Sequence, residues 1–218
     1  MKFSEMKYER PDLAAVKDEL HALTERLKAA RDYAEAREAF LAHEAAYIHM
    51  ETQATLASVR HTIDTRDEFY DAEETFWNAA TPELDAYEDA WKGAMLESPF
   101  RKEFAAEYGD LMFVNAEIAR KAFSPEIIPE SQQENDLSQA YSKLIASAQI
   151  PFEGGVYTIS QLSPFKNDPD DARRLAAWQA EGAWYKEHQA EFDDIYDKMV
   201  HLRDTMGKKL GYGGYTTL

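Results

Sequence analysis

The chain has 218 residues, enough to bury about 70% of the surface that its unfolded form exposes and to build one large core or two small ones. Its 41 acidic and 24 basic side chains give a net charge of -17, which opposes binding to nucleic acids and to anionic membranes. Cysteine is absent, which excludes disulfides and a cysteine nucleophile, and no apolar run resembles a signal segment or a membrane span, so we expect a soluble, cytoplasmic protein.

Two long helices are predicted in the first third of the chain. In the first, apolar side chains recur at alternating steps of three and four, which places them on one helical face. They are Leu13, Val16, Leu20, Leu23 and Leu27. A second, longer stripe predicts an extended helix that packs antiparallel on the first. It consists of Leu41, Ala45, Ile48, Thr52, Leu56, Val59 and Ile63.

Later helices are marked by a recurrent start signal, a capping side chain followed directly by proline. The signal occurs at Thr81-Pro82, Ser98-Pro99, Ser124-Pro125 and Asp168-Pro169. Residues 127–147 have helical periodicity, whereas Gly154-Gly155 separates two β-rich arms and predicts a hairpin.

The last part of the chain predicts a long helix that starts near Asp170, with a kink at His188 and a turn at Gly211. Its near-heptad stripe is interpreted as core packing. The stripe consists of Leu175, Trp178, Gly182, Tyr185, Gln189, Phe192, Tyr196, Met199 and Met206. The predicted fold class is therefore all-α, mainly long antiparallel helices, with one small β-hairpin near residues 149–159.

None of the histidines is placed for a zinc site within this chain. In the nearest motif, His43-Glu44-Ala45-Ala46-Tyr47, tyrosine stands where the second histidine of HExxH is needed. His43 and His49 are about 240° apart around a helix, so they cannot share a metal. Asp197 and His201 fit a general base with its orienting carboxylate, but an exposed charge pair explains them as well and is preferred.

The junction after the second predicted helix concentrates Arg, His, Asp and Tyr side chains, and two interpretations stay open. In the structural one, Asp64 or Thr65 caps a helix and Arg60 pairs with a nearby carboxylate. In the functional one, Arg60, His61 and Tyr70 line a groove that holds a peptide.

The same junction resembles a segment of a known family. It reads Ser-Val-Arg-His from Ser58, followed by Asp64-Thr65 and by Phe69-Tyr70. Four further stretches agree in the same order along the chain. They are Met1-Lys2-Phe3-Ser4 with Tyr8-Glu9-Arg10-Pro11-Asp12-Leu13; Phe100-Arg101-Lys102-Glu103; Phe123-Ser124-Pro125-Glu126-Ile127-Ile128 with Glu134-Asn135-Asp136-Leu137-Ser138; and Ile195-Tyr196-Asp197-Lys198-Met199-Val200 with Lys208-Lys209-Leu210-Gly211-Tyr212. On these motifs the chain resembles the oligoendopeptidase F-like zinc peptidases, relatives of thimet oligopeptidase.

The resemblance implies that residues 1–218 form a single helical N-terminal lobe, which encloses a channel for short peptides together with a C-terminal catalytic lobe. It also implies a catalytic zinc, held by two histidines and a glutamate of an HExxH region. No residue of this sequence matches those positions, so we expect this segment alone to bind no zinc and to cut no peptide, and we expect the enzyme to continue beyond Leu218. The alternative is a non-catalytic, acidic helical interaction module, which the long apolar stripes and the acidic surface indicate.

Overall fold

The computed structural model describes residues 2–217, which are organised in two compact units. Unit 1 comprises residues 2–132 and 205–217, and unit 2 comprises Gln133–Asp204. The chain passes from unit 1 to unit 2 within α6 (Ile128–Ala146) and returns within α9 (Gln189–Lys209). Helices dominate both units, which confirms the predicted all-α class, while the assignment of residues 1–218 to a single lobe stays a prediction.

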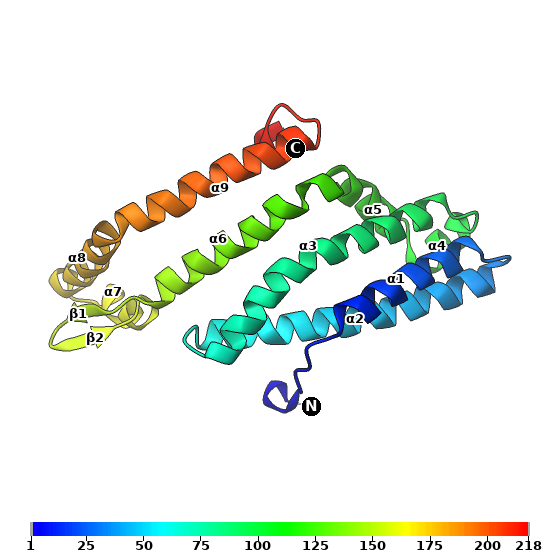
Figure 1. Cartoon of the computed structure of the whole chain (residues 1–218). Coiled ribbons are helices and arrows are strands. Elements are labelled where there is room, and N and C mark those ends of the chain that lie inside the picture. Colours follow the sequence, from blue (N-terminus) through cyan, green and yellow to red (C-terminus); the bar gives the residue numbers. More distant parts are fainter. Residues whose placement is uncertain (1, 218) are drawn as a thin grey trace. The chain divides into compact units, whose positions relative to one another are not determined.

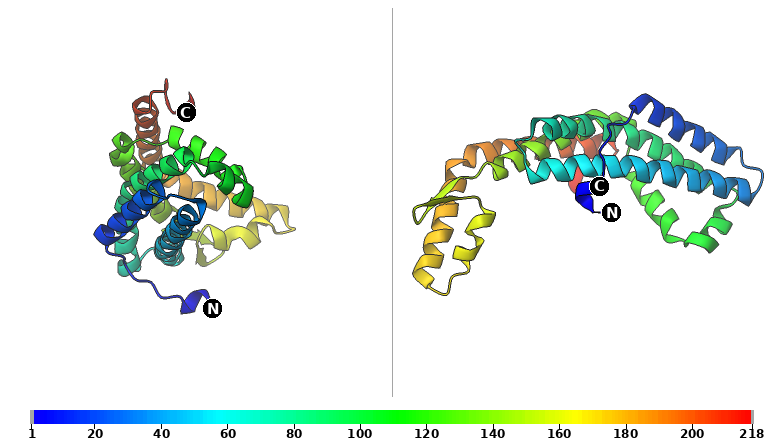
Figure 2. Two further views of the ribbon diagram at one scale, coloured as in Figure 1. Left: turned by 90° about the vertical axis from the view of Figure 1, so that its right-hand side faces the viewer. Right: turned by 90° about the horizontal axis from the view of Figure 1, so that it is seen from below.

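Three long helices lie side by side in unit 1 (Figures 1 and 2). Only a short connection joins the first to the second, so these two run antiparallel, as predicted. The elements of unit 1 outside α6 and α9 are η1 (Phe3–Glu5), α1 (Leu13–Lys28), α2 (Tyr33–Ile63), α3 (Glu68–Glu97), α4 (Arg101–Tyr108), α5 (Leu111–Lys121), η2 (Pro125–Ile127) and η4 (Tyr215–Thr217).

Aspartate side chains begin each of the three long helices. Asp12, Asp32 and Asp67 each accept a hydrogen bond from at least one backbone N–H of the first helical turn. Those N–H groups have no partner within the helix, so each cap stabilises its helix by about 1 kcal/mol. The caps therefore set where each long helix starts.

The proline-marked starts are confirmed in position in three places, although only Ser124 caps its helix with its own side chain, and they are wrong in one. Helices begin shortly after Ser98, Ser124 and Pro169. By contrast, α3 continues through Pro82. A proline inside a helix costs about 3 kcal/mol because it lacks the N–H and its ring meets the preceding turn. Pro82 and Leu84, two residues further on, are both buried, so packing of the surrounding face offsets that cost.

Two apolar clusters form the core of unit 1. One joins α1, α2 and α3, and its buried members are Leu20, Met50, Ala57, Trp77, Ala80 and Leu84. The other joins the ends of α1 and α3 to α2, α4 and α5, and its buried members are Leu27, Ala36, Ala39, Phe40, Trp91, Ala94, Met95, Phe104 and Phe113.

The stripe predicted to pack α2 on α1 points largely away from these clusters, so that prediction is wrong. Among its members, Leu41, Ile48, Val59 and Ile63 are exposed, and Leu56 is buried. The face that packs instead carries small side chains, with Ala36, Ala39 and Ala57 fully buried, because small residues let neighbouring helices approach closely. Although α2 is thus apolar on both sides, no helix within residues 2–217 combines the length and hydrophobicity needed to cross a membrane.

A histidine completes the buried face of α2. The ring of His43 stacks on Trp91 of α3, with centroids 3.8 Å apart and planes within 2°. Its Nε2 lies 3.0 Å from Oε1 of the buried Glu88, and its Nδ1 lies 3.9 Å from Oε1 of Glu44. Burial alone lowers the pKa of His43, but the two carboxylates outweigh burial and raise it above its usual value. Glu88 is the closer and the more buried carboxylate, so it is the principal partner, and this pair ties α2 to α3.

Unit 2 contains the predicted hairpin. The strands pair antiparallel with Ile150 opposite Tyr157, and they are joined by Glu153 and Gly154, which both have positive φ as a tight two-residue turn requires. Besides the parts of α6 and α9, the elements are β1 (Ile150–Phe152), β2 (Gly155–Tyr157), η3 (Ser160–Leu162), α7 (Ser163–Lys166) and α8 (Asp171–Glu187). The core of this unit is formed by Ala148, Ile150, Leu162 and Trp184.

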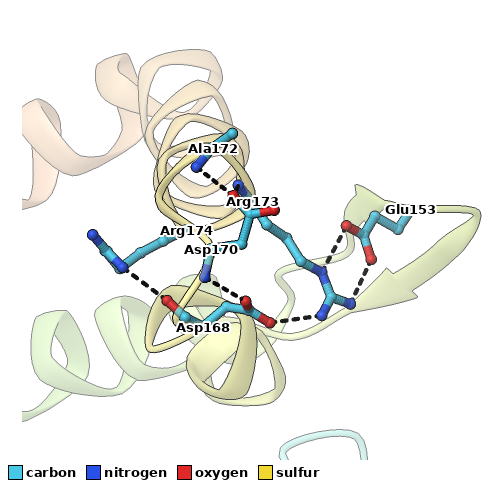
Figure 3. A network of polar contacts seen from close by, with 6 residues as sticks. All are labelled: Glu153, Asp168, Asp170, Ala172, Arg173 and Arg174. Carbon is cyan, nitrogen blue, oxygen red and sulfur yellow. Dashed lines mark hydrogen bonds and ion pairs between the residues drawn. The ribbon is translucent and has the colours of Figure 1, made fainter.

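An arginine fixes the hairpin to the start of α8 (Figure 3). Arg173 donates to both carboxylate oxygens of Glu153, at 2.9 and 2.7 Å, and to Oδ2 of Asp168 at 2.7 Å. The predicted cap, Asp168, is replaced by Asp170, which accepts from the N–H of Ala172 at 2.8 Å. These ion pairs are partly exposed, so they fix geometry more than they add stability.

The predicted break in the last long helix is confirmed, because α8 ends at Glu187 and α9 starts at Gln189. The turn at Gly211 is confirmed as well, with a φ of 87° that favours glycine. The predicted core stripe is largely wrong. Leu175, Trp178, Tyr185 and Tyr196 are exposed, and the buried aromatic residue is Trp184. The residues at near-heptad spacing lie mostly on the exposed face of these helices. The buried face of α8 is the one that packs against the hairpin.

We expect unit 1 to lose stability as the pH rises above about 6.5, the ordinary histidine value. The pKa of His43 is raised in the folded chain, so its contribution is complete below the unfolded pKa and is lost as the pH rises through the folded pKa. Glu88→Gln should lower the free energy of unfolding by about 3 kcal/mol at pH 6 and flatten this dependence, since it removes one partner of a buried pair. Thermal melts between pH 6 and 9 measure both effects.

The matched control is His201→Gln, because His201 lies 3.5 Å from Asp197 but its side chain is 76% exposed. It should leave the slope of melting temperature against pH unchanged. Identical pH profiles for Glu88→Gln and the wild type would contradict the assignment to the buried pair.

Candidate functional site

The predicted site lies at the turn between α2 and α3. Asp67 begins α3 by accepting hydrogen bonds from the N–H groups of Phe69 and Tyr70, at 3.0 and 3.1 Å. Asp64, one of the predicted caps, ends α2 instead and accepts a hydrogen bond from the N–H of Arg66 at 3.1 Å. The helix start therefore lies later in the chain than the sequence indicated, and it holds Tyr70 in the first turn of α3.

Arg60 and Tyr70 come together, as the functional interpretation required. Nη1 of Arg60 donates to the hydroxyl of Tyr70 at 2.7 Å, and Nη2 donates to the backbone carbonyl of Met6. The guanidinium also lies 5.5 Å from the ring centroid of Tyr70 and 5.6 Å from that of Phe3. Within residues 2–217 it contacts no carboxylate, so the ion pair proposed by the structural interpretation is not formed.

His61 occupies a different environment. It is 3% exposed, and its Nε2 lies 3.2 Å from Oδ1 of Asp71 on α3. A side chain this buried cannot contact a ligand at the surface. Its contact with Asp71 links the end of α2 to α3.

The third component of the site is the N-terminal arm, residues 2–10, which the sequence did not indicate. Glu73 is 4% exposed and accepts hydrogen bonds from the hydroxyl of Tyr8 and from Nε and Nη2 of Arg10, the latter two at 2.9 and 2.7 Å. The indole N–H of Trp77 donates to the Tyr8 hydroxyl at 3.1 Å. Arg10 holds the pKa of Glu73 below its usual value, while burial and Glu73 raise the pKa of Tyr8 to about 12. The arm is thus anchored through a buried carboxylate.

A signal for this anchor is present in the sequence. Glu73, Trp77, Ala80 and Leu84 are spaced by four, three and four, which places a carboxylate on the buried face of α3. A buried carboxylate requires donors, because an unpaired charge in the interior is costly. The spacing shows the need for partners, but Tyr8 lies more than sixty residues earlier and is identified as one only by the structure.

A cavity opens between the arm and the turn, and we name it the arm cavity. Its volume is about 640 Å³, in the range of sites for small ligands. It is lined by Ser4, Met6, Lys7, Tyr8, Glu9, Arg60, Phe69 and Tyr70. A second hollow of about 380 Å³ lies between Phe3 and Met6 of the arm and the exposed side of α2. The predicted residues Arg60 and Tyr70 therefore face a space that can accept a ligand.

The described residues do not fit a metal ion. Among residues 2–217, no three His, Asp or Glu side chains are grouped so that they could hold one. His43 is engaged with Glu88 in the core, and Asp197 and His201 form an exposed pair along α9, as the preferred interpretation stated.

Residues 3–123, which include all but the first residue of the arm and the helices α1 to α5, match the family model of the peptidase M3 N-terminal domain. The match covers more than half of the chain. The chain belongs to the peptidase M3 family. The resemblance drawn from the sequence motifs is therefore confirmed.

Solved structures support the same assignment for the M3 chain. A protein assigned as oligoendopeptidase F is 38% identical, with a TM-score of 0.95 over 99% of this chain. PZ peptidase A, solved with an inhibitor, is 36% identical with a TM-score of 0.94, and a protein from Bacillus anthracis assigned as oligoendopeptidase F is 33% identical with a TM-score of 0.94. The chain spans only 38% to 40% of the length of these relatives. The comparison with curated proteins gave no match.

The arm should loosen when its buried anchor is weakened. Tyr8→Phe removes a hydrogen bond to a charged acceptor and leaves the Trp77 indole without it, so we expect a loss of about 1.5–3 kcal/mol in the free energy of unfolding. Trypsin should also cut faster after Lys7 of the arm. Denaturant titration and limited proteolysis measure the two effects.

The matched control is Tyr196→Phe, because Tyr196 is 71% exposed in unit 2. It should change neither stability nor the cleavage rate. Unchanged cleavage after Lys7 in Tyr8→Phe would show that Glu73 does not anchor the arm through this hydroxyl.

Proposed function

We propose that this chain is the N-terminal, channel-forming part of a zinc-dependent oligoendopeptidase that hydrolyses short peptides. The observation that carries the proposal is the agreement of nearly the whole chain with three peptidases at TM-scores of 0.94 to 0.95, of which it accounts for 38% to 40%. The rest of each relative is large enough for a catalytic lobe, which would be the partner of this chain. The cysteine-free sequence suits the reducing cytoplasm, where we place the protein.

In this proposal the chemistry and the substrate contacts are divided between two parts. The zinc and its HExxH ligands belong to the catalytic lobe, because residues 2–217 offer no group that fits a metal. The lobe described here shapes the channel. Arg60 and Tyr70 contribute to the channel wall at the arm cavity, and His61 holds Arg60 in place from behind.

The proposal predicts that the coding sequence continues past Leu218 into an HExxH region. The continuous polypeptide should bind one zinc ion per chain and cleave a quenched oligopeptide, whereas the 218-residue chain should hold no stoichiometric zinc and leave the peptide uncut. Metal analysis and a fluorescence assay on both proteins provide the test.

The control is the continuous polypeptide with the HExxH glutamate changed to glutamine, which should keep the metal and lose cleavage. A stop codon directly after Leu218 would instead favour the non-catalytic interaction module. Cleavage of the peptide by the 218-residue chain would contradict the division of roles.

The wall assignment predicts different effects for its two testable side chains. In the continuous enzyme, Tyr70→Phe should raise KM by about threefold to tenfold and leave kcat nearly unchanged, as expected for the loss of one substrate contact, while the lost hydrogen bond from Arg60 lowers the free energy of unfolding by about 1 kcal/mol. His61→Ala should mainly lower the melting temperature, because His61 is buried beside Asp71. Peptide kinetics and melts on the same preparations separate the two effects. If KM is unaltered in Tyr70→Phe, Tyr70 is not part of the wall.

A further inference from the structure

Arg60 differs from every other arginine that the structure describes. Each of the other ten contacts an aspartate or glutamate within ion-pair distance, whereas the hydrogen bonds of Arg60 go to a phenol hydroxyl and a backbone carbonyl. The contrast is informative because the chain carries 41 acidic side chains, so a carboxylate is available to almost any arginine at the surface. The cationic group of Arg60 is kept without a counterion beside a cavity.

The guanidinium of Arg60 is held rigidly and retains donors. It carries five N–H groups, and the bonds to Tyr70 and Met6 use two of them, so three have no partner within residues 2–217. The side chain is half-buried, and the rings of Tyr70 and Phe3 flank it. A guanidinium fixed in this way loses little side-chain entropy when it binds a planar anion.

The rest of the arm cavity reinforces this preference. Lys7 supplies a second cationic group and, within the described residues, is without an ion pair, whereas Glu9 is the one carboxylate of the lining. The wall is completed by aromatic rings, since Tyr8 lies 6.1 Å from both Phe69 and Tyr70 in edge-on arrangements. The cavity thus combines a net positive charge with an apolar wall, in a chain whose net charge is -17.

We propose that the arm cavity binds a carboxylate of a peptide, which the guanidinium of Arg60 and the ammonium group of Lys7 receive while the aromatic rings cover the adjoining side chain. This inference rests on the proposed peptide-binding role and names the group that is recognised. The carboxylate belongs either to the peptide's C-terminus or to an acidic side chain, since both have the same planar, bidentate chemistry. Recognition of a chain end would favour short peptides, because each offers an end close to its scissile bond.

The test is an NMR titration of the isotopically labelled 218-residue chain with three N-acetylated pentapeptides. The first is Ala-Leu-Ala-Leu-Ala as the free acid, the second is its C-terminal amide, and the third is the amide with aspartate at the central position. The free acid should shift the amide signals of the arm and of the α2–α3 turn and bind about tenfold more tightly than the plain amide, as expected when one charge-assisted hydrogen bond is lost. Tight binding of the aspartate amide assigns the site to acidic side chains, and weak binding assigns it to the C-terminus.

Two variants and one control connect the binding to the named groups. Lys7→Gln and Arg60→Lys should each weaken binding of the free acid severalfold while the plain amide is unaffected. Lys7→Gln leaves every bond of Arg60 in place, so its effect cannot come from a displaced arm. Arg66→Gln is the matched control, since Arg66 belongs to the same turn, pairs with Asp64 and is 88% exposed; it should change nothing.

Equal affinity for the free acid, the plain amide and the aspartate amide would overturn the carboxylate site and leave the peptide-binding role intact. Absence of binding by all three peptides would also overturn it, whereas the proposed function is judged separately by zinc content and cleavage in the continuous polypeptide. Unchanged affinity of both Lys7→Gln and Arg60→Lys for the free acid would show that the two cationic groups are not the receptors.

Discussion

The carboxylate of Glu73 lies inside unit 1, on a face of α3 that otherwise packs apolar side chains. A charge in that position is costly unless donors surround it, and here they come from Tyr8 and Arg10 of the arm. The requirement for partners therefore holds the arm against the helices. With the arm in place, the carbonyl of Met6 reaches Arg60, and one wall of the arm cavity is formed.

The same logic applies further along the α2–α3 pair. His43 and Glu88 are both buried and lie 3.0 Å apart, so their mutual attraction offsets part of the cost that each would carry alone. The surrounding face of α2 includes three buried alanines, Ala36, Ala39 and Ala57, which let the backbones approach closely at these positions. The buried polar pair therefore fixes the position of α2 along α3, while the small residues allow the two helices to pack closely.

The outer side of α2 bears on the proposed role of the chain. Exposed Leu41, Ile48 and Ile63 give this helix a second apolar stripe opposite its buried face, as expected for a helix that is covered on more than one side. A chain that accounts for 38% to 40% of its relatives' length has room for such cover in a longer polypeptide. The exposed stripe thus supports the proposal that the lobe works together with a catalytic part. It also explains why periodicity alone selected the wrong face.

The sequence by itself determined the helical class, the hairpin at Gly154, most helix starts and the family, because these depend on local backbone preferences and on motifs that are read in order along the chain. It also brought Arg60 and Tyr70 to attention as neighbours at a helix junction. Only the tertiary structure decided which side of α2 is buried, that His61 points inward, and that the arm is bound to Glu73. Those outcomes depend on contacts between residues far apart in the chain, whose free energies are set by close packing and by the cost of unpaired buried charges, and neither has a periodicity in the sequence.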